Sequence, residues 1–333
     1  MRRLFPVLPD IAAVTRRPLH TLARCLAACA LLASTPTLAS SPVDMPQLQL
    51  ASAAAAVGRP GVDAPLFQKH ADQVVPIASI TKLMTAMVVL DSGASLSEWL
   101  EILERDTPAP ANAYSRIRIG SEAQRQDLLH IALMSSENLA AHVLARHHPG
   151  GKDAFVAAMN DKARALGMHQ TRFVDATGLS SDNVSTAADL LKMVLAAHEY
   201  EAIRQFSSAG RHDVRFRKPR YSLAYGNTNA LVHAESWGVA LSKTGYLSAA
   251  GRCLVMVADV EGEPVAMVLL DSLGTRTPRG DAGRVRRWMT TGDSGSVAAA
   301  ALAYEQERTA QFGAGPQLAE GRNTPAATDR AGY

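Results

Sequence analysis

The chain has 333 residues, of which 47% are hydrophobic and 20% are charged, a composition typical of a globular protein with one large domain or two modest ones. The first 39 residues hold five of the 34 basic residues and one of the 31 acidic ones, which leaves 29 basic and 30 acidic residues and a net charge of −1 in the body of the chain. A near-neutral body argues against nucleic acid as the main partner, because binding phosphates requires a concentrated basic face.

The amino terminus has the features of an export signal. An arginine-bearing stretch ends at Arg24, the apolar run Cys25–Ala33 follows, and small residues occur at Thr37–Ala39. The run is too short to cross a bilayer as a permanent helix. We therefore predict a cleavable signal peptide over residues 1–39 and a soluble periplasmic product with no stable membrane span.

Other interpretations of this segment stay open. The apolar run is also compatible with a buried helix, and Thr15–Leu19 weakly resembles a twin-arginine signal. Leu26–Cys29 resembles a lipoprotein box, although little apolar sequence precedes it. After cleavage only Cys253 remains, so no internal disulfide can form, and its apolar surroundings favour a small buried side chain over a nucleophile.

The first part of the mature chain is predicted to be an extended lead-in followed by helices. Residues 40–65 are rich in Ala, Pro and Gly and form the lead-in. The mostly apolar stretch Ser79–Leu90 indicates a buried helix capped by Ser79. Three-to-four periodicity predicts further helices over Asp127–Met134, Ser136–His147, Asp153–Leu166 and Thr186–Tyr200.

Later in the chain the pattern changes to short β-branched runs separated by Gly or polar turns, which is typical of an antiparallel meander. The predicted strands are Val239–Tyr246, Arg252–Val260 and Pro264–Leu270, with a closing helix over Asp281–Thr291. From about Glu305 to residue 333 the composition favours a disordered tail. The fold class expected for residues 66–304 is α+β, with helices packed against an antiparallel sheet.

The first pattern with chemical meaning is Ser79-Ile80-Thr81-Lys82. On a helix, residues three apart share a face, so the Lys82 amine can reach the Ser79 hydroxyl. A serine hydroxyl becomes a good nucleophile when a neighbouring base takes its proton, and a lysine whose pKa is lowered can be that base. Alone, the pattern is more often a helix cap beside a surface lysine.

The second pattern is Ser136-Glu137-Asn138, just after a predicted helix. The Ser136 hydroxyl can relay a proton to a leaving nitrogen, and the Asn138 carboxamide can hold both the lysine and a substrate backbone. For this tripeptide taken alone, ordinary helix capping by Ser136 is the better interpretation.

The third pattern is Lys243-Thr244-Gly245, inside a predicted strand. Lys243 supplies a cation for a carboxylate and a like charge that lowers the pKa of Lys82. Thr244 can donate a hydrogen bond to the same carboxylate, and Gly245 lets a substrate backbone come close to the strand. By itself the tripeptide is usually a turn with a solvated charge. The three patterns together, however, make a complete acyl-transfer site.

The trio resembles that of the low-molecular-mass penicillin-binding proteins, the D-alanyl-D-alanine peptidase family, and is similar to its endopeptidase branch. The resemblance covers roughly Leu50 to Leu302. Besides the trio, it is carried by Pro76–Leu90, Tyr114–Arg116, Ala132–Asn138, Pro149–Gly151, Thr171–Phe173, Thr177–Leu179 and Asn227–Asn229. It implies a β-lactamase/transpeptidase-like fold, an antiparallel sheet flanked by helices with a helical subdomain.

The resemblance also implies roles for residues. Ser79 would be acylated, Lys82 would activate it, and Ser136 and Asn138 would complete the proton network and align the peptide. The implied substrates are peptidoglycan stem peptides, with β-lactams as covalent inhibitors and no cofactor.

On the substrate side, the resemblance implies that Lys243 and Thr244 engage the carboxylate of the peptide or of a penicillin. The oxyanion would lie between the amides of Ser79 and Tyr246. One departure from the family is Arg252, where a histidine or bulky residue is expected; it bears on which carboxylate is preferred. A second is Ala51–Pro65, which lacks the usual strand-forming sequence.

Chain length favours the endopeptidase branch, because only 88 residues follow Gly245. Carboxypeptidase members resemble this chain and then add a β-rich domain and an amphipathic anchor, neither of which is expected here. Three alternatives remain: an enzyme that only removes terminal D-alanine, a penicillin sensor without turnover, and a β-lactamase. A β-lactamase needs a general base for rapid deacylation, and no acidic loop in the sequence supplies one. The histidines include no His-x-x-x-His pair with a glutamate beside it, and no metal is expected.

Overall fold

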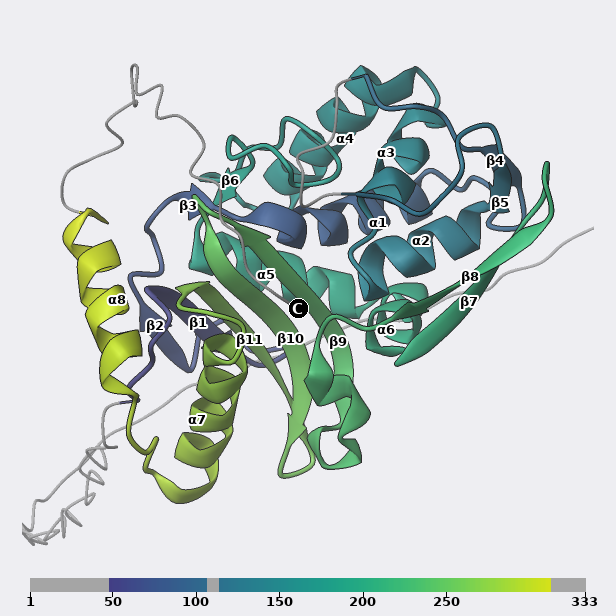
Figure 1. The fold of residues 1–333 in the computed structure, drawn as a ribbon. Coiled ribbons are helices and arrows are strands. Elements are labelled where there is room, and N and C mark those ends of the chain that lie inside the picture. The colour runs from purple at the N-terminus through teal and green to yellow at the C-terminus, as the bar shows by residue number, and fades with distance from the viewer. Residues whose placement is uncertain (1–47, 107–113, 313–333) are drawn as a thin grey trace, which may run out of the picture. The chain divides into compact units, whose positions relative to one another are not determined.

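A computed structural model describes residues 48–106 and 114–312. The predicted signal peptide over residues 1–39, the start of the predicted lead-in and the end of the predicted tail lie outside the described residues. The described part of the chain contains a five-stranded antiparallel sheet with helices on both faces (Figure 1). This is the α+β architecture that the sequence predicts.

The strand order of the sheet is β2-β1-β11-β10-β9, so the last three strands form a meander and β9 lies at an edge. The bounds are β1 Ala54–Gly58, β2 Phe67–Lys69, β9 Val239–Leu247, β10 Gly251–Val260 and β11 Glu263–Ser272. The three strands predicted late in the chain are confirmed. Apolar residues run almost without interruption through β10 and β11 because both faces of the sheet are covered.

Helices cover the sheet and build a helical subdomain beside it (Figure 1). The helices are α1 Thr81–Asp91, α2 Arg125–Met134, α3 Asn138–Arg146, α4 Gly151–Ala165, α5 Ala187–His198, α6 Glu201–Ser208, α7 Thr277–Thr291 and α8 Ala299–Ala310. The predicted helices are confirmed with shifts of a few residues at their ends, whereas α6 was not predicted.

Alternate residues of the central strands face opposite layers. On β10, Val255 and Val257 belong to the core shared with the helical subdomain. Leu254 and Met256 belong to a second core, which includes Trp288 of α7. The sheet therefore separates two apolar layers, and the helical layer is the larger.

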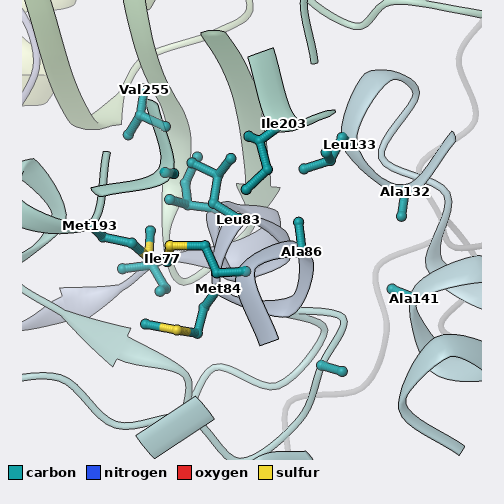
Figure 2. Close-up of a cluster of buried hydrophobic side chains, with 14 of the residues drawn as sticks. Ile77, Leu83, Met84, Ala86, Ala132, Leu133, Ala141, Met193, Ile203 and Val255 are labelled. Carbon is teal, nitrogen blue, oxygen red and sulfur yellow. The ribbon is translucent and has the colours of Figure 1, made fainter. Parts of the chain in front are cut away.

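Helix α1 is the centre of the larger core. Its residues from Thr81 to Val89 are all buried, as is typical of a helix enclosed on every side. Leu83, Met84 and Ala86 lie among side chains from the sheet and from other helices, such as Val255 (Figure 2). Packing from all directions holds α1 in place, and with it any side chain that projects from its first turn.

Several short elements complete the subdomain. Two-residue strands β3 (Val75–Pro76) and β6 (Val184–Ser185) pair with each other, as do β4 (Trp99–Glu101) and β5 (Glu122–Gln124). The hairpin of β7 (Arg211–Phe216) and β8 (Tyr221–Gly226) was not predicted. Because polar residues alternate with apolar ones and several are exposed, this hairpin lacked the apolar run of the other strands.

The predicted lead-in over residues 40–65 needs correction, because it contains a central strand. β1 pairs with β11 on one side and β2 on the other, and all five of its residues are buried. Four of these residues are Ala or Gly and the fifth is Val, so the strand propensity of the segment is weak. Small side chains are required here because α5 packs closely: a Cβ on Gly58 would lie 3.0 Å from Leu191.

The predicted disordered tail from Glu305 also needs correction, since α8 continues to Ala310. Tyr304 donates a hydrogen bond to the buried carboxylate of Asp271 at 2.7 Å, and Arg308 contacts the same carboxylate at 2.6 Å. Lys69 and Glu305 form an ion pair at 2.9 Å. These tertiary contacts stabilise a helix that local composition alone did not indicate.

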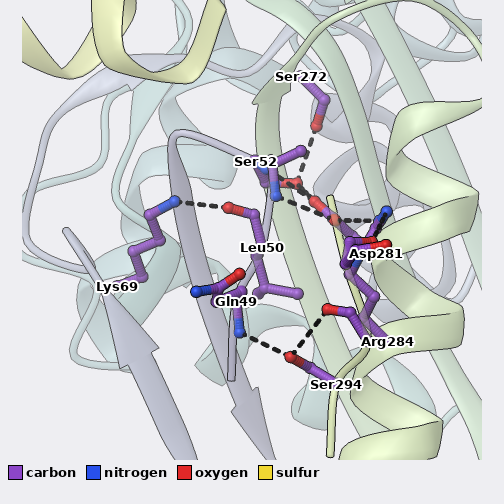
Figure 3. Close-up of polar contacts among 11 residues, drawn as sticks. Gln49, Leu50, Ser52, Lys69, Ser272, Asp281, Arg284 and Ser294 are labelled. Carbon is purple, nitrogen blue, oxygen red and sulfur yellow. Dashed lines mark hydrogen bonds and ion pairs between the residues drawn. The ribbon is translucent and has the colours of Figure 1, made fainter. Parts of the chain in front are cut away.

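The buried carboxylate of Asp281 joins the start of the described chain to α7 (Figure 3). It accepts hydrogen bonds from the amides of Ala51 and Ser52, at 3.0 and 2.7 Å, and from the Ser52 hydroxyl at 2.6 Å. Arg284 forms an ion pair with it at 2.9 Å. The segment leading into β1 is thus attached to the helix that covers the outer face of the sheet.

We expect Asp281→Ala to lower the free energy of unfolding by about 3 kcal/mol, because it leaves two buried amides without an acceptor and removes the carboxylate that pairs with Arg284. Denaturant unfolding of the full chain measures the change. Asp161→Ala is the matched control, because Asp161 pairs with Arg164 on an exposed helix face and should change stability by less than about 0.5 kcal/mol. Equal effects would contradict this role of Asp281.

Candidate active site

The predicted nucleophile lies at the junction of β3 and α1, in a 3-10 turn over Ala78–Ile80. The prediction that Ser79 caps a helix is wrong: α1 begins at Thr81, its N-cap is Ile80, and no side chain caps it. The Ser79 hydroxyl is therefore not used by the helix. Its side chain is half-buried and lines a cavity of about 850 Å³.

The turn before the serine has an unusual backbone. Ala78 has a φ of +48°, a left-handed conformation that costs energy for a residue with a Cβ. Thr81 stabilises it by donating a hydrogen bond to the Ala78 carbonyl at 2.8 Å. Gly178 packs against the same carbonyl so closely that a Cβ would lie 2.0 Å from the oxygen. The packing of this loop sets the position of Ser79.

Lys82 lies one helical turn after the serine, with its Nζ 2.9 Å from the Ser79 Oγ. The amine also donates to the Asn138 Oδ1 at 2.7 Å and to the Thr177 carbonyl at 2.5 Å. Its side chain is almost completely buried. Of the predicted residues, the structure thus brings Ser79, Lys82 and Asn138 into direct contact.

Burial lowers the pKa of Lys82 to about 7, against the opposing effect of Asp175 and Glu137, and Arg105 lowers it further. The prediction that Lys243 causes this decrease is not supported. Burial and then the charge of Lys82 hold the pKa of Lys243 well below its usual range. Each amine lies in a site that disfavours its charged form, chiefly because water is excluded.

Ser136 and Asn138 occupy the link between α2 and α3. Ser136 has a φ of +61°, and Glu137, rather than Ser136, caps α3 by accepting a hydrogen bond from the Ala140 amide. Helix capping, the alternative explanation for Ser136, is therefore wrong. Its hydroxyl instead accepts a hydrogen bond from the Lys243 Nζ at 2.9 Å.

Lys243, Thr244 and Gly245 lie on the edge strand β9, as predicted. Lys243 is buried and also donates to the Thr244 carbonyl at 2.8 Å. Gly245 lies against the nucleophile turn: a Cβ there would lie 3.2 Å from the Ser79 amide nitrogen and 3.1 Å from the Ile77 carbonyl. A larger residue would push the strand away from the serine.

One cavity brings most of the predicted site residues together. Ser79, Ser136, Asn138, Thr244, Gly245 and Tyr246 all line it. Tyr246 is exposed, and the Arg252 guanidinium lies 3.9 Å from the centre of its ring. The cavity thus lies between the helical subdomain and the edge of the sheet, with the two buried amines beneath it.

Thr228 and Thr177 contact predicted site residues, although no role was assigned to either of them from the sequence. The Thr228 and Thr244 hydroxyls are 2.6 Å apart, so they form a pair at the cavity wall. The Thr177 carbonyl is one of the three acceptors around Lys82. Both residues lie in short stretches that resemble the family, and this resemblance was the only signal in the sequence that could have identified them. Their contacts join segments that are far apart in the chain, so no local sequence pattern predicts them.

Comparison with known proteins identifies the family. Residues 45–274, more than half of the chain, match a family model described as D-alanyl-D-alanine carboxypeptidase. The chain belongs to this serine peptidase family. It is 47% identical to a D-alanyl-D-alanine endopeptidase of Pseudomonas aeruginosa, over 88% of this chain and 94% of that protein. A D-alanyl-D-alanine endopeptidase of Escherichia coli is also 47% identical, over 82% and 88% of the two chains.

Solved structures similar to this fold include a DD-transpeptidase and a penicillin-binding protein. A variant of a Streptomyces DD-transpeptidase has a TM-score of 0.67 at 27% identity, covering 74% of this chain and 99% of that one. A penicillin-binding protein of Listeria monocytogenes, in its ampicillin-bound form, has a TM-score of 0.63 at 29% identity with the same coverage. The transpeptidase-like fold inferred from the sequence is confirmed.

Other kinds of site were searched for within residues 48–106 and 114–312. Cys253 is buried, and burial raises the pKa of its thiol to about 12, which makes it a poor nucleophile. In these ranges no group of three or more His, Cys, Asp or Glu side chains is placed to hold a metal ion. None of the helices in them combines the length and apolar character needed to cross a bilayer.

We expect the rate of acylation by a labelled penicillin to rise with pH up to about 7 and then to level off, because only the neutral Lys82 amine can accept the serine proton. The rate is measured from the amount of covalently labelled protein in reactions quenched at fixed times across a pH series. Circular dichroism at each pH serves as the control for folding. A rate that stays constant through pH 7 in folded protein would show that Lys82 is not the base.

Proposed function

We propose that this protein hydrolyses the D-alanyl peptide bonds of peptidoglycan crosslinks through an acyl-enzyme on Ser79. The observation that carries the proposal is the Lys82 amine, which has a pKa of about 7 and lies 2.9 Å from the Ser79 Oγ. Acyl transfer requires a base that is neutral in a large fraction of molecules near pH 7 and lies within hydrogen-bond distance of a serine in a cavity.

In the acylation step, Lys82 takes the proton of the Ser79 hydroxyl, and Oγ attacks the D-alanyl carbonyl carbon. The negative charge that develops on the carbonyl oxygen would be stabilised by the amides of Ser79 and Tyr246. The carbon–nitrogen bond then breaks as Ser136 passes a proton to the leaving amine and regains one from the Lys82 ammonium, which makes the lysine neutral again. Water, activated by the same lysine, hydrolyses the ester and restores the Ser79 hydroxyl.

The buried amine of Lys243 has a second role in the proposal, to bind the carboxylate of the leaving residue together with Thr244. A carboxylate placed beside Lys243 would raise the pKa of that amine, so that binding of the substrate creates the charge that holds it. Asn138, which already contacts Lys82, presents its carboxamide to the cavity and would align the peptide backbone.

The endopeptidase reaction is favoured over removal of terminal D-alanine alone because the chain resembles proteins named endopeptidases over most of its length. Hydrolysis of penicillin as the main reaction is disfavoured. Glu137 is the only carboxylate residue in the described lining of the cavity, and its side chain is engaged at the start of α3. No other acid there can activate water for rapid deacylation.

Peptidoglycan crosslinks lie outside the inner membrane, so the proposal places the protein in the periplasm. The predicted signal peptide over residues 1–39 supports export. The proposed ligands are crosslinked stem peptides as substrates and β-lactams as covalent inhibitors. Neither a cofactor nor nucleic acid takes part.

Incubation of the mature protein with crosslinked muropeptide dimers tests the proposal, with chromatography as the measurement. We expect the wild type to convert dimers into monomers, Ser79→Ala to lose all conversion, and Lys82→Ala to be slower by a factor of at least ~10² because the general base is lost. Release of D-alanine from pentapeptides with dimers left intact would identify a carboxypeptidase. Acylation by penicillin without any peptide hydrolysis would identify a sensor.

A further inference from the structure

The cavity extends beyond the nucleophile toward the hairpin of β7 and β8. At this end, which we call the hairpin end, the lining residues are Tyr114, Arg116, Ala224 and Tyr225. Thr228 follows the hairpin, and its hydroxyl lies 2.6 Å from that of Thr244. The hairpin end therefore begins where the carboxylate-binding residues of the proposed site end.

Tyr225 has a hydroxyl that no residue of the described chain satisfies. The side chain is only 8% exposed, and its oxygen has no hydrogen-bond partner within residues 48–106 and 114–312. Leaving a buried polar group unpaired costs free energy, so such a group in a cavity wall indicates that a ligand supplies the partner. Tyr221, on the same strand, differs: its hydroxyl bonds with the Ser121 hydroxyl and the Arg118 amide, both at 2.9 Å.

Charged groups of both signs surround this hydroxyl. The Arg116 guanidinium lies 5.0 Å from the centre of the Tyr225 ring and donates a hydrogen bond to the Ala224 carbonyl at 2.6 Å. Glu137 lines the cavity nearby, and burial followed by this carboxylate raises the pKa of the Tyr225 hydroxyl. The hydroxyl therefore keeps its proton at neutral pH and can donate it to an oxygen acceptor.

The position of the hairpin end relative to the scissile bond follows from the residues between them. Lys243 and Thr244 would hold the carboxylate of the residue that leaves, and Ser136 would protonate its amine. The Thr228 hydroxyl contacts that of Thr244, so the hairpin end adjoins the residues that would hold this carboxylate. The hairpin end consequently faces the leaving group and whatever is attached to it.

We propose that Tyr225 and Arg116 form a subsite for the extended leaving group of a crosslink. The chemical class is a peptide-bearing amino acid whose side-chain amine is acylated by D-alanine. Its first carboxylate binds at Lys243 and Thr244, while amide or carboxylate oxygens further along the acceptor peptide accept hydrogen bonds from Tyr225 and Arg116.

This inference rests on the proposed endopeptidase function and gives a physical reason for it. A free D-alanine leaving group ends at its methyl group and carboxylate, so it does not extend past Thr244. The leaving group of a crosslink continues through an aliphatic chain into a second stem peptide. Only the larger leaving group reaches the Tyr225 hydroxyl, so the subsite favours crosslinks over terminal D-alanine.

The test is Tyr225→Phe, which removes one oxygen that makes no hydrogen bond in the described free protein and keeps the ring under Arg116. Cleavage of crosslinked muropeptide dimers and release of D-alanine from pentapeptide monomers are measured side by side. We expect the ratio of kcat/KM for dimers to kcat/KM for monomers to fall about tenfold, the effect of one lost hydrogen bond to substrate. The loss should appear mainly in KM for the dimer.

The matched control is Tyr221→Phe, which removes a hydroxyl from the same strand that is already paired within the protein and does not line the cavity. We expect this variant to unfold at a lower temperature with an unchanged ratio. If the wild type cleaves dimers and Tyr225→Phe leaves the ratio of the two kcat/KM values unchanged, the subsite is overturned and the proposed function stands. Wild type that leaves dimers intact but is acylated by penicillin would overturn the proposed function and the subsite with it.

Discussion

The position of one buried amine, that of Lys82, is the constraint on which the site depends. An ammonium group excluded from water and without a bonded carboxylate is costly, and here the cost appears as a pKa of about 7 rather than as an unfolded protein. Its three acceptors, on Ser79, Asn138 and Thr177, come from three separate segments. The base can work only while those segments stay packed around α1.

The rest of the fold keeps these segments in place. Helix α1 is enclosed on all sides, so its first turn cannot shift without disturbing the larger core. The sheet supplies the opposite wall of the cavity through its edge strand β9, where Gly245 allows close contact with the nucleophile turn. Away from β9, Asp281 attaches the segment before β1 to α7, and Asp271 attaches α8 to β11, so the sheet is also stabilised far from the cavity.

Within the cavity, satisfied and unsatisfied polar groups have different functions. Ser136, Thr244 and Asn138 are hydrogen-bonded to protein before any substrate is present, which orients them for catalysis. Tyr225 has no such partner among the described residues. In the proposed reaction, the hydrogen-bonded residues would carry out acyl transfer, and the unpaired Tyr225 hydroxyl would help to select the leaving group.

The amino-acid sequence was enough to predict the family and the order of most helices and strands. It also predicted the Ser79–Lys82 pair, because a three-residue spacing on a helix is a local property. The remaining features depend on contacts between residues that are far apart in the sequence. β1 is made of small residues whose strand conformation comes from pairing and burial, and α8 is held by Asp271, so neither has a local pattern. The cause of the lowered Lys82 pKa, the engagement of Ser136 by Lys243 and the unpaired hydroxyl of Tyr225 depend on contacts between distant segments, which no spacing in the chain records.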